Sequence, residues 1–356
     1  MRGETGVRER VIRISRMGPA GHITLDRPAK LNALSPAMLA DMHAALDAWA
    51  RDPGVRLVVL DGAGPRGFCA GGDLRILYDF ARADLAAARA FWADEYRLDA
   101  ALAGYAKPVV AFMTGIVMGG GVGLSAHTRH RIVTESTQLA MPEAAAGLIP
   151  DVGATWLLSR APGETGTYLA LSGARIGAAD ALALGLADVF VPEAALDALK
   201  AALLAEAPGD DIAVRSVVAR YARTAGPGPL GARRATIDAC FAYDTVEAIV
   251  AALEADGSPF ARSAAGAIAE QSPTSLKLTL HALRTARHLR DVRQCLQLEY
   301  RVMSRILDGH DFYEGTRAIV IDKDRAPRWR PATLADVTPA QVARHFAPLG
   351  NEELRF

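Results

Sequence analysis

Two carboxylates in an otherwise apolar segment are the residues of this 356-residue chain best suited to acid–base chemistry. Glu143 and Asp151 each directly follow a proline in the segment 141–151, MPEAAAGLIPD. Burial disfavours the charged form, so it would raise the pKa of either carboxyl toward neutrality, where an acid or a base is most useful. The alternative is that Glu143 and Asp151 each cap a short helix, and the segment by itself leaves both interpretations open.

Two glycine-rich segments could offer backbone N–H groups to a negatively charged oxygen. FCAGGD (68–73) follows an apolar run, and MGGGVGLS (118–125) lies between a predicted strand and a predicted helix. Glycine lets the backbone approach a ligand closely, and N–H groups at a helix start favour negative charge. Each segment could also be an ordinary turn between a strand and a helix. On adjacent strand ends, however, the pair could supply two donors to one oxyanion.

Other side chains that could do chemistry lack partners in the sequence. Cys69 has no nearby histidine, so a small buried filler is the favoured interpretation. His127 and His130 have a spacing that can share a metal ion, but no carboxylate pattern accompanies them, and we expect no metal site. The chain contains no Gly-x-Ser-x-Gly segment of the kind a serine hydrolase needs. Three cysteines far apart argue against a disulfide framework.

The elements that must position these residues alternate between strands and helices in the first half of the chain. Short β-prone or apolar runs predict strands, and amphipathic spacing predicts helices. The predicted strands cover 11–15, 22–25, 57–60, 109–113 and 131–135. The predicted helices cover 36–51, about 84–104, a segment after the second glycine run and parts of 154–183. This alternation predicts an α/β core over residues 1–192.

Strand signals stop after residue 192, and only helical patterns follow. They cover 193–205, 211–224, 245–255, 272–288, 291–307 and about 338–345, separated by segments rich in glycine and proline. Residues 193–356 are therefore expected to form a helical C-terminal region that completes a pocket or an interface.

Composition narrows the class of protein and the kind of partner. Hydrophobic residues make up 51% and charged residues 22%, which is typical of globular proteins, and forty basic residues balance forty acidic ones. A protein that binds nucleic acid through a basic surface is therefore not expected. The charge-free segment 108–128 holds too many glycines for a membrane span. Without an apolar signal segment near its start, the chain is predicted to be cytoplasmic, with no membrane partner.

Several motifs in a fixed order resemble one family. ITLDRPAKLNAL (23–34), the two glycine segments and MPEAAAGLIPDVGATWLLSR (141–160) resemble the crotonase, or enoyl-CoA hydratase/isomerase, superfamily. SPTSLKLTLHALR, LEYRVMSRI and GHDFYEGTRAIVIDKDRAPRW extend the resemblance over about residues 22–331. Within the superfamily the chain looks most like the hydrolases of 3-hydroxyisobutyryl-CoA, which act in valine degradation. The resemblance implies an α/β fold, a spiral of strand-strand-helix repeats followed by a helical C-terminal region.

The resemblance also implies the ligand and the groups that hold it. The substrate would be an acyl-CoA, and coenzyme A would enter as part of it, with no other cofactor. The thioester oxygen would lie between the N–H groups of Ala70 and Gly120. Neighbouring substrate-binding positions would be Gly71, Gly72, Asp73 and Gly119. Assemblies of several kinds occur in this superfamily, so the resemblance is compatible with a homo-oligomer.

The carboxylates distinguish branches of the superfamily. A hydratase resembling this chain would carry a glutamate where Gly123 stands, so hydration by a pair of glutamates is not expected. Glu143 and Asp151 match the spacing of the 3-hydroxyisobutyryl-CoA hydrolases and also of dienoyl-CoA isomerases, whereas the C-terminal motifs favour the hydrolases. Glu143 would attack the thioester or activate a water, and Asp151 would orient the substrate hydroxyl or assist proton transfer.

Further positions follow from the same resemblance or from charge. Asp94 matches an acidic substrate-pocket position of the hydrolases. Lys30, Lys323 and Arg325 are candidates for the CoA phosphates by charge alone, and each could equally be a solvated surface cation. Two alternatives stay open: an enoyl-CoA or dienoyl-CoA hydratase or isomerase, and a catalytically silent protein that binds acyl-CoA.

Overall fold

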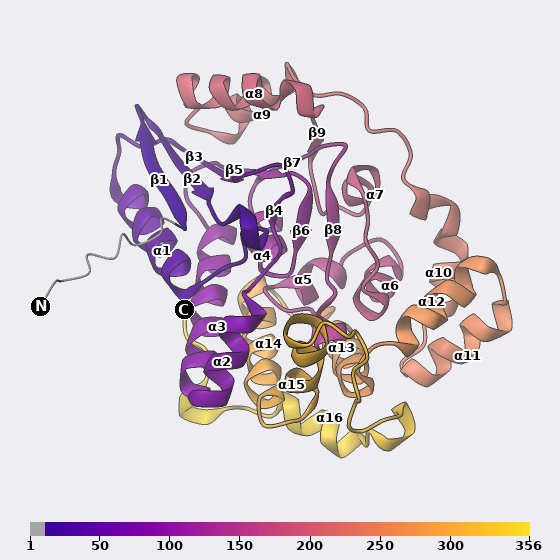
Figure 1. The fold of residues 1–356 in the computed structure, drawn as a ribbon. Helices are drawn as coiled ribbons and strands as arrows, with labels where there is room; N and C mark the ends of the chain where they lie inside the picture. Colours follow the sequence, from indigo (N-terminus) through magenta and orange to yellow (C-terminus); the bar gives the residue numbers. More distant parts are fainter. Residues whose placement is uncertain (1–10) are drawn as a thin grey trace, which may run out of the picture.

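Parallel strands connected by helices build the first half of the chain in a computed structural model that describes residues 11–356 (Figure 1). The larger sheet has six strands in the order β1-β2-β3-β5-β7-β9, and only the β1–β2 pair is antiparallel. Its strands are β1 (Ile12–Met17), β2 (Ala20–Leu25), β3 (Leu57–Gly62), β5 (Val109–Met113), β7 (His130–Val133) and β9 (Val189–Phe190). All five predicted strands are confirmed. The start of the chain, on which the signal-segment prediction rests, lies outside the described residues.

A smaller sheet lies beside the first, and the sequence did not predict its strands. It holds β4 (Gly67–Cys69), β6 (Ile116–Met118) and β8 (Gln138–Ala140), parallel and in that order. Three residues are too few to produce a recognisable alternation. Three successive turns, which begin at β3, β5 and β7, each contribute one strand to the large sheet, the next to the small sheet, and then a helical segment. The predicted spiral of strand-strand-helix repeats is thus confirmed.

The strands at the centre of the large sheet are covered on both faces. Val58 and Leu60 of β3 belong to the main hydrophobic core, whereas Leu57 and Val59 belong to a second core on the opposite face. Helices α8 (Glu193–Glu206) and α9 (Asp211–Ala219) supply the second core, and Figure 1 shows them above the sheet. Burial on both faces explains why this strand reads as a continuous apolar run.

Helices and short turns connect the strands in the first half of the chain. They are α1 (Pro36–Arg51), α2 (Leu74–Ala83), α3 (Leu85–Ala103), α4 (Gly120–Ala126), α5 (Ala154–Leu158), α6 (Thr165–Ser172) and α7 (Ala178–Ala183), with short turns η1 (Pro28–Lys30) and η2 (Glu143–Ala146). The helices predicted over 36–51 and about 84–104 correspond to α1 and α3. Asp73 begins α2 because its side chain accepts hydrogen bonds from the N–H groups of Arg75 and Ile76.

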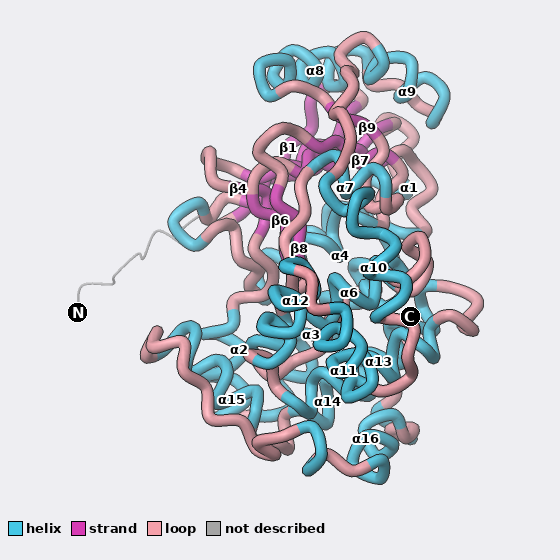
Figure 2. The backbone as a smooth tube through the Cα atoms, turned by 90° about the vertical axis from the view of Figure 1, so that its right-hand side faces the viewer, coloured by secondary structure: helices cyan, strands magenta, loops and turns pink. Residues whose placement is uncertain are grey.

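The second half is helical, as predicted. It contains, after α8 and α9, the helices α10 (Arg234–Cys240), α11 (Val246–Asp256), α12 (Pro259–Ala269), α13 (Pro273–Ala286), α14 (Val292–Ile306), α15 (Asp311–Thr316) and α16 (Pro339–Phe346), and the short turns η3 (Pro229–Arg233), η4 (Arg317–Ile321), η5 (Leu334–Asp336) and η6 (Gly350–Glu352). Helices α14 and α15 pack against α3 and α2 (Figure 2). The main core draws residues from both halves, so the boundary at 192/193 stays a prediction. Within residues 11–356, no helix combines the length and hydropathy that crossing a membrane requires.

A charged contact attaches α8 to the large sheet. Lys200 Nζ lies 2.6 Å from Asp61 Oδ2 at the end of β3, and His22 Nε2 lies 3.2 Å from Asp61 Oδ1. Burial alone would raise the pKa of Asp61, but the contact with His22 and the charge of Lys200 outweigh burial and lower this pKa to about 2. The Asp61 side chain is 7% exposed, so water screens the contact little.

We expect Asp61→Asn to lower the free energy of unfolding by about 2 kcal/mol at pH 7, because one pKa unit corresponds to about 1.4 kcal/mol. A carboxyl with a lowered folded pKa stabilises the fold above its unfolded pKa of about 4. The difference between wild type and variant should therefore disappear as the pH falls from 4 to 2. Urea unfolding measures this difference in stability. The control is Asp79→Asn, which breaks the exposed ion pair between Arg75 and Asp79. Equal stability of wild type and Asp61→Asn at pH 7 would contradict this account.

Candidate active site

Both glycine segments and both predicted carboxylates line one cavity of about 220 Å³. Strands β4 and β6 are parallel neighbours, so the loops that follow them leave the small sheet side by side. The backbones touch: a Cβ atom on Gly71 would lie 3.1 Å from the Met118 carbonyl oxygen and 3.2 Å from the Gly120 nitrogen. Gly71 also has a φ of +96°, which favours glycine. The cavity lining comprises Ala70, Gly71, Gly72, Leu74, Leu77, Trp92, Glu95, Gly119, Gly120, Pro142, Glu143, Ala145, Ala146, Leu148, Asp151, Val152, Met303 and Ile319.

The two N–H donors of this cavity are not quite the predicted pair. The Ala70 N–H donates to the Leu31 carbonyl oxygen at 3.0 Å, so it is already used and the assignment to Ala70 needs correcting. Gly72 lies two residues further on and forms the bridge to Leu34 without using its own N–H. Gly120 is the first residue of α4, where N–H groups have no partner inside the helix. Within residues 11–356, neither the Gly72 nor the Gly120 N–H has an acceptor.

Glu143 begins the turn η2 and points at the second glycine loop. A Cβ atom on Gly119 would lie 3.0 Å from Glu143 Oε1, and Gly119 has a φ of +51°. Glu143 Oε2 is buried and has no hydrogen-bond partner among the described residues. Burial raises the pKa of Glu143 well above its usual value, and the charge of Asp151 raises it further. Oε2 of this carboxyl is therefore free, among the described residues, to form a hydrogen bond with a ligand in the cavity.

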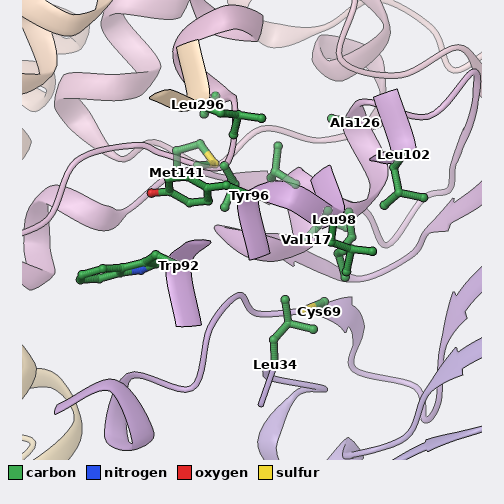
Figure 3. Close-up of a cluster of buried hydrophobic side chains, with 14 of the residues drawn as sticks. Leu34, Cys69, Trp92, Tyr96, Leu98, Leu102, Val117, Ala126, Met141 and Leu296 are labelled. Atoms are coloured by element: carbon green, nitrogen blue, oxygen red, sulfur yellow. The ribbon is translucent and has the colours of Figure 1, made fainter. Parts of the chain in front are cut away.

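Asp151 is 5% exposed and has one close side-chain partner. The Tyr96 hydroxyl donates to Asp151 Oδ2 at 2.6 Å. Burial raises the pKa of Asp151 to about 7, although the Tyr96 hydrogen bond acts in the opposite direction. Tyr96 and Trp92 belong to the buried face of α3 and to the hydrophobic cluster of Figure 3. The Tyr96 hydrogen bond thus connects Asp151 to the main hydrophobic core, and the pKa of this carboxyl lies near neutrality.

The acidic pocket residue of α3 is Glu95 and not Asp94. The Asp94 side chain is 58% exposed and pairs with Arg97 at 3.0 Å, so the prediction for Asp94 was wrong by one residue. Glu95 is 2% exposed, lines the cavity and has a buried Oε1 without a partner. Burial, together with the charge of Asp151, raises the pKa of Glu95 well above its usual value. The helical spacing from Trp92 would have identified Glu95 as the inward position.

Two glycines of α4 make room for the acids of α3. A Cβ atom on Gly120 would fall on Glu95 Oε1. A Cβ atom on Gly123 would lie 2.8 Å from Asp99 Oδ1 and 2.7 Å from Val152 Cβ. Asp99 and Val152 therefore occupy the space beside Gly123, where a related hydratase would carry a glutamate. The carboxyl that α3 supplies to the cavity is that of Glu95.

Glu299 of α14 holds the loop that carries Asp151, and the sequence analysis missed it. Glu299 Oε2 accepts from the Gly153 N–H at 2.7 Å, and Oε1 accepts from the Thr155 N–H at 3.0 Å and the Thr155 hydroxyl at 2.5 Å. Burial raises the pKa of Glu299 to about 8, against the effect of these three hydrogen bonds. The segment LEYRVMSRI gave no signal for this role, because the partners are backbone groups far away in the sequence.

The remaining candidates lie away from the cavity or have structural partners. Asp73 was expected to bind substrate, but it does not line the cavity. Its side chain caps α2, and Asp73 Oδ2 lies 3.0 Å from Arg27 Nη2. The Lys30 side chain is 58% exposed, and Lys30 Nζ lies 3.6 Å from Asp73 Oδ2. Lys323 and Arg325 are exposed beyond η4, and no contact brings either of them to Lys30. A role in binding CoA phosphates stays a prediction for all three.

Cys69, His127 and His130 lie outside the cavity lining, and each contacts a neighbouring residue. Cys69 is buried, and its Sγ donates to the Asn32 carbonyl oxygen at 3.2 Å, which fits a core filler. His127 Nε2 lies 2.8 Å from the Val152 carbonyl oxygen, and His130 pairs with Asp211 at 2.9 Å. Across residues 11–356, no group of three or more histidine, cysteine, aspartate or glutamate side chains could hold a metal ion.

The fold and the cavity together define the class. Residues 20–346 match the family described as enoyl-CoA hydratase/isomerase, and the chain belongs to this family. The similarity to solved structures agrees: a carnitinyl-CoA dehydratase from Mycobacterium thermoresistibile is 46% identical with a TM-score of 0.93, covering 98% of this chain and 99% of that one. An enoyl-CoA hydratase from Rhodobacter sphaeroides 2.4.1 is 45% identical with a TM-score of 0.91, covering 97% of this chain and 100% of that one.

Two relatives that are similar over nearly the whole chain are both named as 3-hydroxyisobutyryl-CoA hydrolases. The mitochondrial 3-hydroxyisobutyryl-CoA hydrolase of Gallus gallus is 42% identical over 347 residues, 96% of this chain and 90% of its own length. The mitochondrial 3-hydroxyisobutyryl-CoA hydrolase of Homo sapiens is 39% identical over 361 residues, 100% of this chain and 93% of its own length. The similarity thus extends through the helical second half.

We expect Gly123→Ala to lower the free energy of unfolding by about 1–3 kcal/mol, because the added methyl group must displace Val152 or Asp99. Gly266→Ala is the matched control in α12, where a Cβ atom would meet nothing within 4 Å. That change should stabilise by about 0.5–1 kcal/mol, the usual gain of alanine over glycine in a helix. Urea unfolding of both variants measures the contrast. An equal gain at both positions would contradict the close packing of α3 on α4.

Proposed function

We propose that this protein hydrolyses 3-hydroxyacyl-CoA thioesters, with 3-hydroxyisobutyryl-CoA as substrate and 3-hydroxyisobutyrate and CoA as products. The observation that carries the proposal is one cavity lined by Glu143 and Asp151 together with Gly72 and Gly120, whose N–H groups have no acceptor among residues 11–356. The names of the relatives, at 39–42% identity over nearly the whole chain, support the substrate. No cofactor is needed, since water is the second reactant.

The N–H groups of Gly72 and Gly120 would receive the thioester oxygen. Addition to the carbonyl carbon places negative charge on this oxygen, and donors fixed in a water-poor cavity stabilise that charge. The loss of one such donor typically costs about 3–4 kcal/mol in the transition state. Backbone donors have the advantage here that strands β4 and β6 fix both loops before the substrate arrives.

Glu143 would act on the carbonyl carbon and Asp151 on the hydroxyl end of the acyl group. In its ionised form Glu143 either attacks the carbon, expelling the CoA thiolate and leaving an acyl-enzyme that water opens, or removes a proton from an attacking water. Both routes give the free acid and CoA. Asp151, fixed by Tyr96, would accept a hydrogen bond from the substrate hydroxyl or assist proton transfer. Glu95 Oε1 lies in the same cavity as a second partner for that hydroxyl.

A second candidate is the hydration or dehydration of an enoyl-CoA. It is favoured by the names of the two structures at 45–46% identity. The packing of Asp99 and Val152 at Gly123 is evidence against a second glutamate of the hydratase kind. The ultraviolet absorbance of an α,β-unsaturated thioester distinguishes the two reactions, because hydrolysis releases thiol and dehydration creates the conjugated bond.

The Glu143→Gln variant should lose thioesterase turnover by about 10²–10⁴-fold, the usual contribution of a positioned acid or base. Binding of CoA should change little, since the amide has nearly the same shape. Free thiol release from 3-hydroxyisobutyryl-CoA measures turnover, and Glu254→Gln on the exposed face of α11 is the control. Full turnover by Glu143→Gln would exclude the proposed role.

The pH dependence of kcat/KM should reflect the carboxyl of Asp151. Its pKa of about 7 means that the ionised fraction increases between pH 6 and pH 8. If Asp151 works as a carboxylate, kcat/KM increases with pH, up to about tenfold per unit below pH 7, and levels off above it. Asp151→Asn should remove this inflection. A rate that falls with pH over the same interval would contradict the assignment.

Location and assembly are separate parts of the proposal. The chain is expected to act in the cytoplasm, whereas several relatives are named as mitochondrial proteins. A homo-oligomer stays compatible with the fold. Sedimentation of the purified chain and fractionation of its cells test these two points independently of the chemistry.

A further inference from the structure

A π-helical turn brings one aliphatic side chain to the cavity. The turn η4 (Arg317–Ile321) follows directly on α15, and Ile319 within it lines the cavity together with Leu74, Leu77 and Met303. Ile319 is 39% exposed, whereas its neighbour Ala318 is fully buried. π-Helical turns are rare and occur frequently at functional sites. A large apolar side chain on an open cavity wall gains stability when a ligand covers it.

The geometry of this turn depends on Arg317. Its guanidinium forms a two-pronged contact with Glu314, Nε to Oε2 at 3.0 Å and Nη2 to Oε1 at 2.8 Å. Its Nη1 donates to Asp322 and Asp324, each at 2.7 Å. Arg317 thereby joins the end of α15 to the segment that follows η4, and Ile319 lies between these two attachment points. A guanidinium can make all these contacts at once, whereas an ammonium cannot.

We propose that Ile319 is a substrate-binding residue that packs against the methylene segments of the CoA thiol arm, which is the pantetheine chain that carries the sulfur. We propose further that Arg317 is the positioning residue that holds Ile319 there. The inference rests on the proposed thioester substrate. Asp151 is 5% exposed and Glu143 Oε2 is buried, whereas Ile319 is 39% exposed, so Ile319 marks the open part of the cavity lining. A small 3-hydroxyacyl group extends only a few atoms from the thioester carbon, so the thiol arm must occupy the open part.

The test measures binding and turnover of four proteins: wild type, Ile319→Ala, Arg317→Lys and the double variant. The ligand is a non-hydrolysable thioether analogue of 3-hydroxyisobutyryl-CoA, followed by calorimetry. Ile319→Ala and Arg317→Lys should each raise Kd about five- to tenfold, and the double variant should be little worse than Ile319→Ala, because both changes remove the same contact. KM for the thioester should rise in parallel, with kcat within about twofold of wild type.

Two control variants match the changes elsewhere on the surface. Ile14→Ala removes an isoleucine that is 37% exposed on β1, outside the cavity. Arg234→Lys removes the contact of Arg234 Nε with both carboxylate oxygens of Asp238 on α10. Neither should change Kd. The fold-change in Kd should also be the same for analogues with a smaller or a larger acyl part, since the contact lies on the thiol side.

Three results would overturn the inference. They are an unchanged Kd for Ile319→Ala, a lower melting temperature of Arg317→Lys with an unchanged Kd, and a rise in Kd that grows with the size of the acyl part. Failure of the proposed function is a different result. In that case wild type would release no thiol from the thioester, while calorimetry with the thioether analogue would still decide the role of Ile319.

Discussion

The packing of α3 on α4 is the constraint on which the cavity depends. Gly120 and Gly123 have no side chains, and the carboxyls of Glu95 and Asp99 occupy that space. Any larger residue at Gly120 would displace Glu95 from the wall and move the N–H group next to it. The same contact therefore fixes the N–H group of Gly120 and the carboxyl of Glu95. Burial disfavours the charged form and raises the pKa of both Glu95 and Asp99 well above their usual values.

The second half of the chain completes this arrangement from outside the spiral. Glu299 holds the backbone at Gly153 and Thr155, two to four residues beyond Asp151. Ile319 and Met303 add apolar wall to the same cavity. A spiral core alone would leave the loop of Asp151 without its partner and the cavity open on one side. The family similarity likewise covers residues 20–346 and does not stop where the strands end.

The sequence predicted the long elements and the two carboxylates Glu143 and Asp151 that line the cavity, because these depend on local patterns. The helix 36–51 has a proline at its start and a regular apolar face, and the structure places it within the same limits. The three-residue strands of the small sheet were missed because three residues carry no period. The family resemblance implied Asp94, whereas the neighbouring acid Glu95 occupies the inward face of α3. It also implied the N–H of Ala70, which a tertiary hydrogen bond to the Leu31 carbonyl oxygen already uses.

Hydrolysis of a thioester whose acyl group carries a 3-hydroxyl is the reaction that this cavity supports best. The most direct measurement compares free thiol release from 3-hydroxyisobutyryl-CoA and from isobutyryl-CoA, which differ only in that hydroxyl, by the purified wild-type chain. We expect rapid release from the hydroxylated ester and much slower release from the saturated one, because Asp151 and Glu95 have a hydroxyl to bind only in the first. Measurable CoA binding without thiol release from either ester would contradict this expectation.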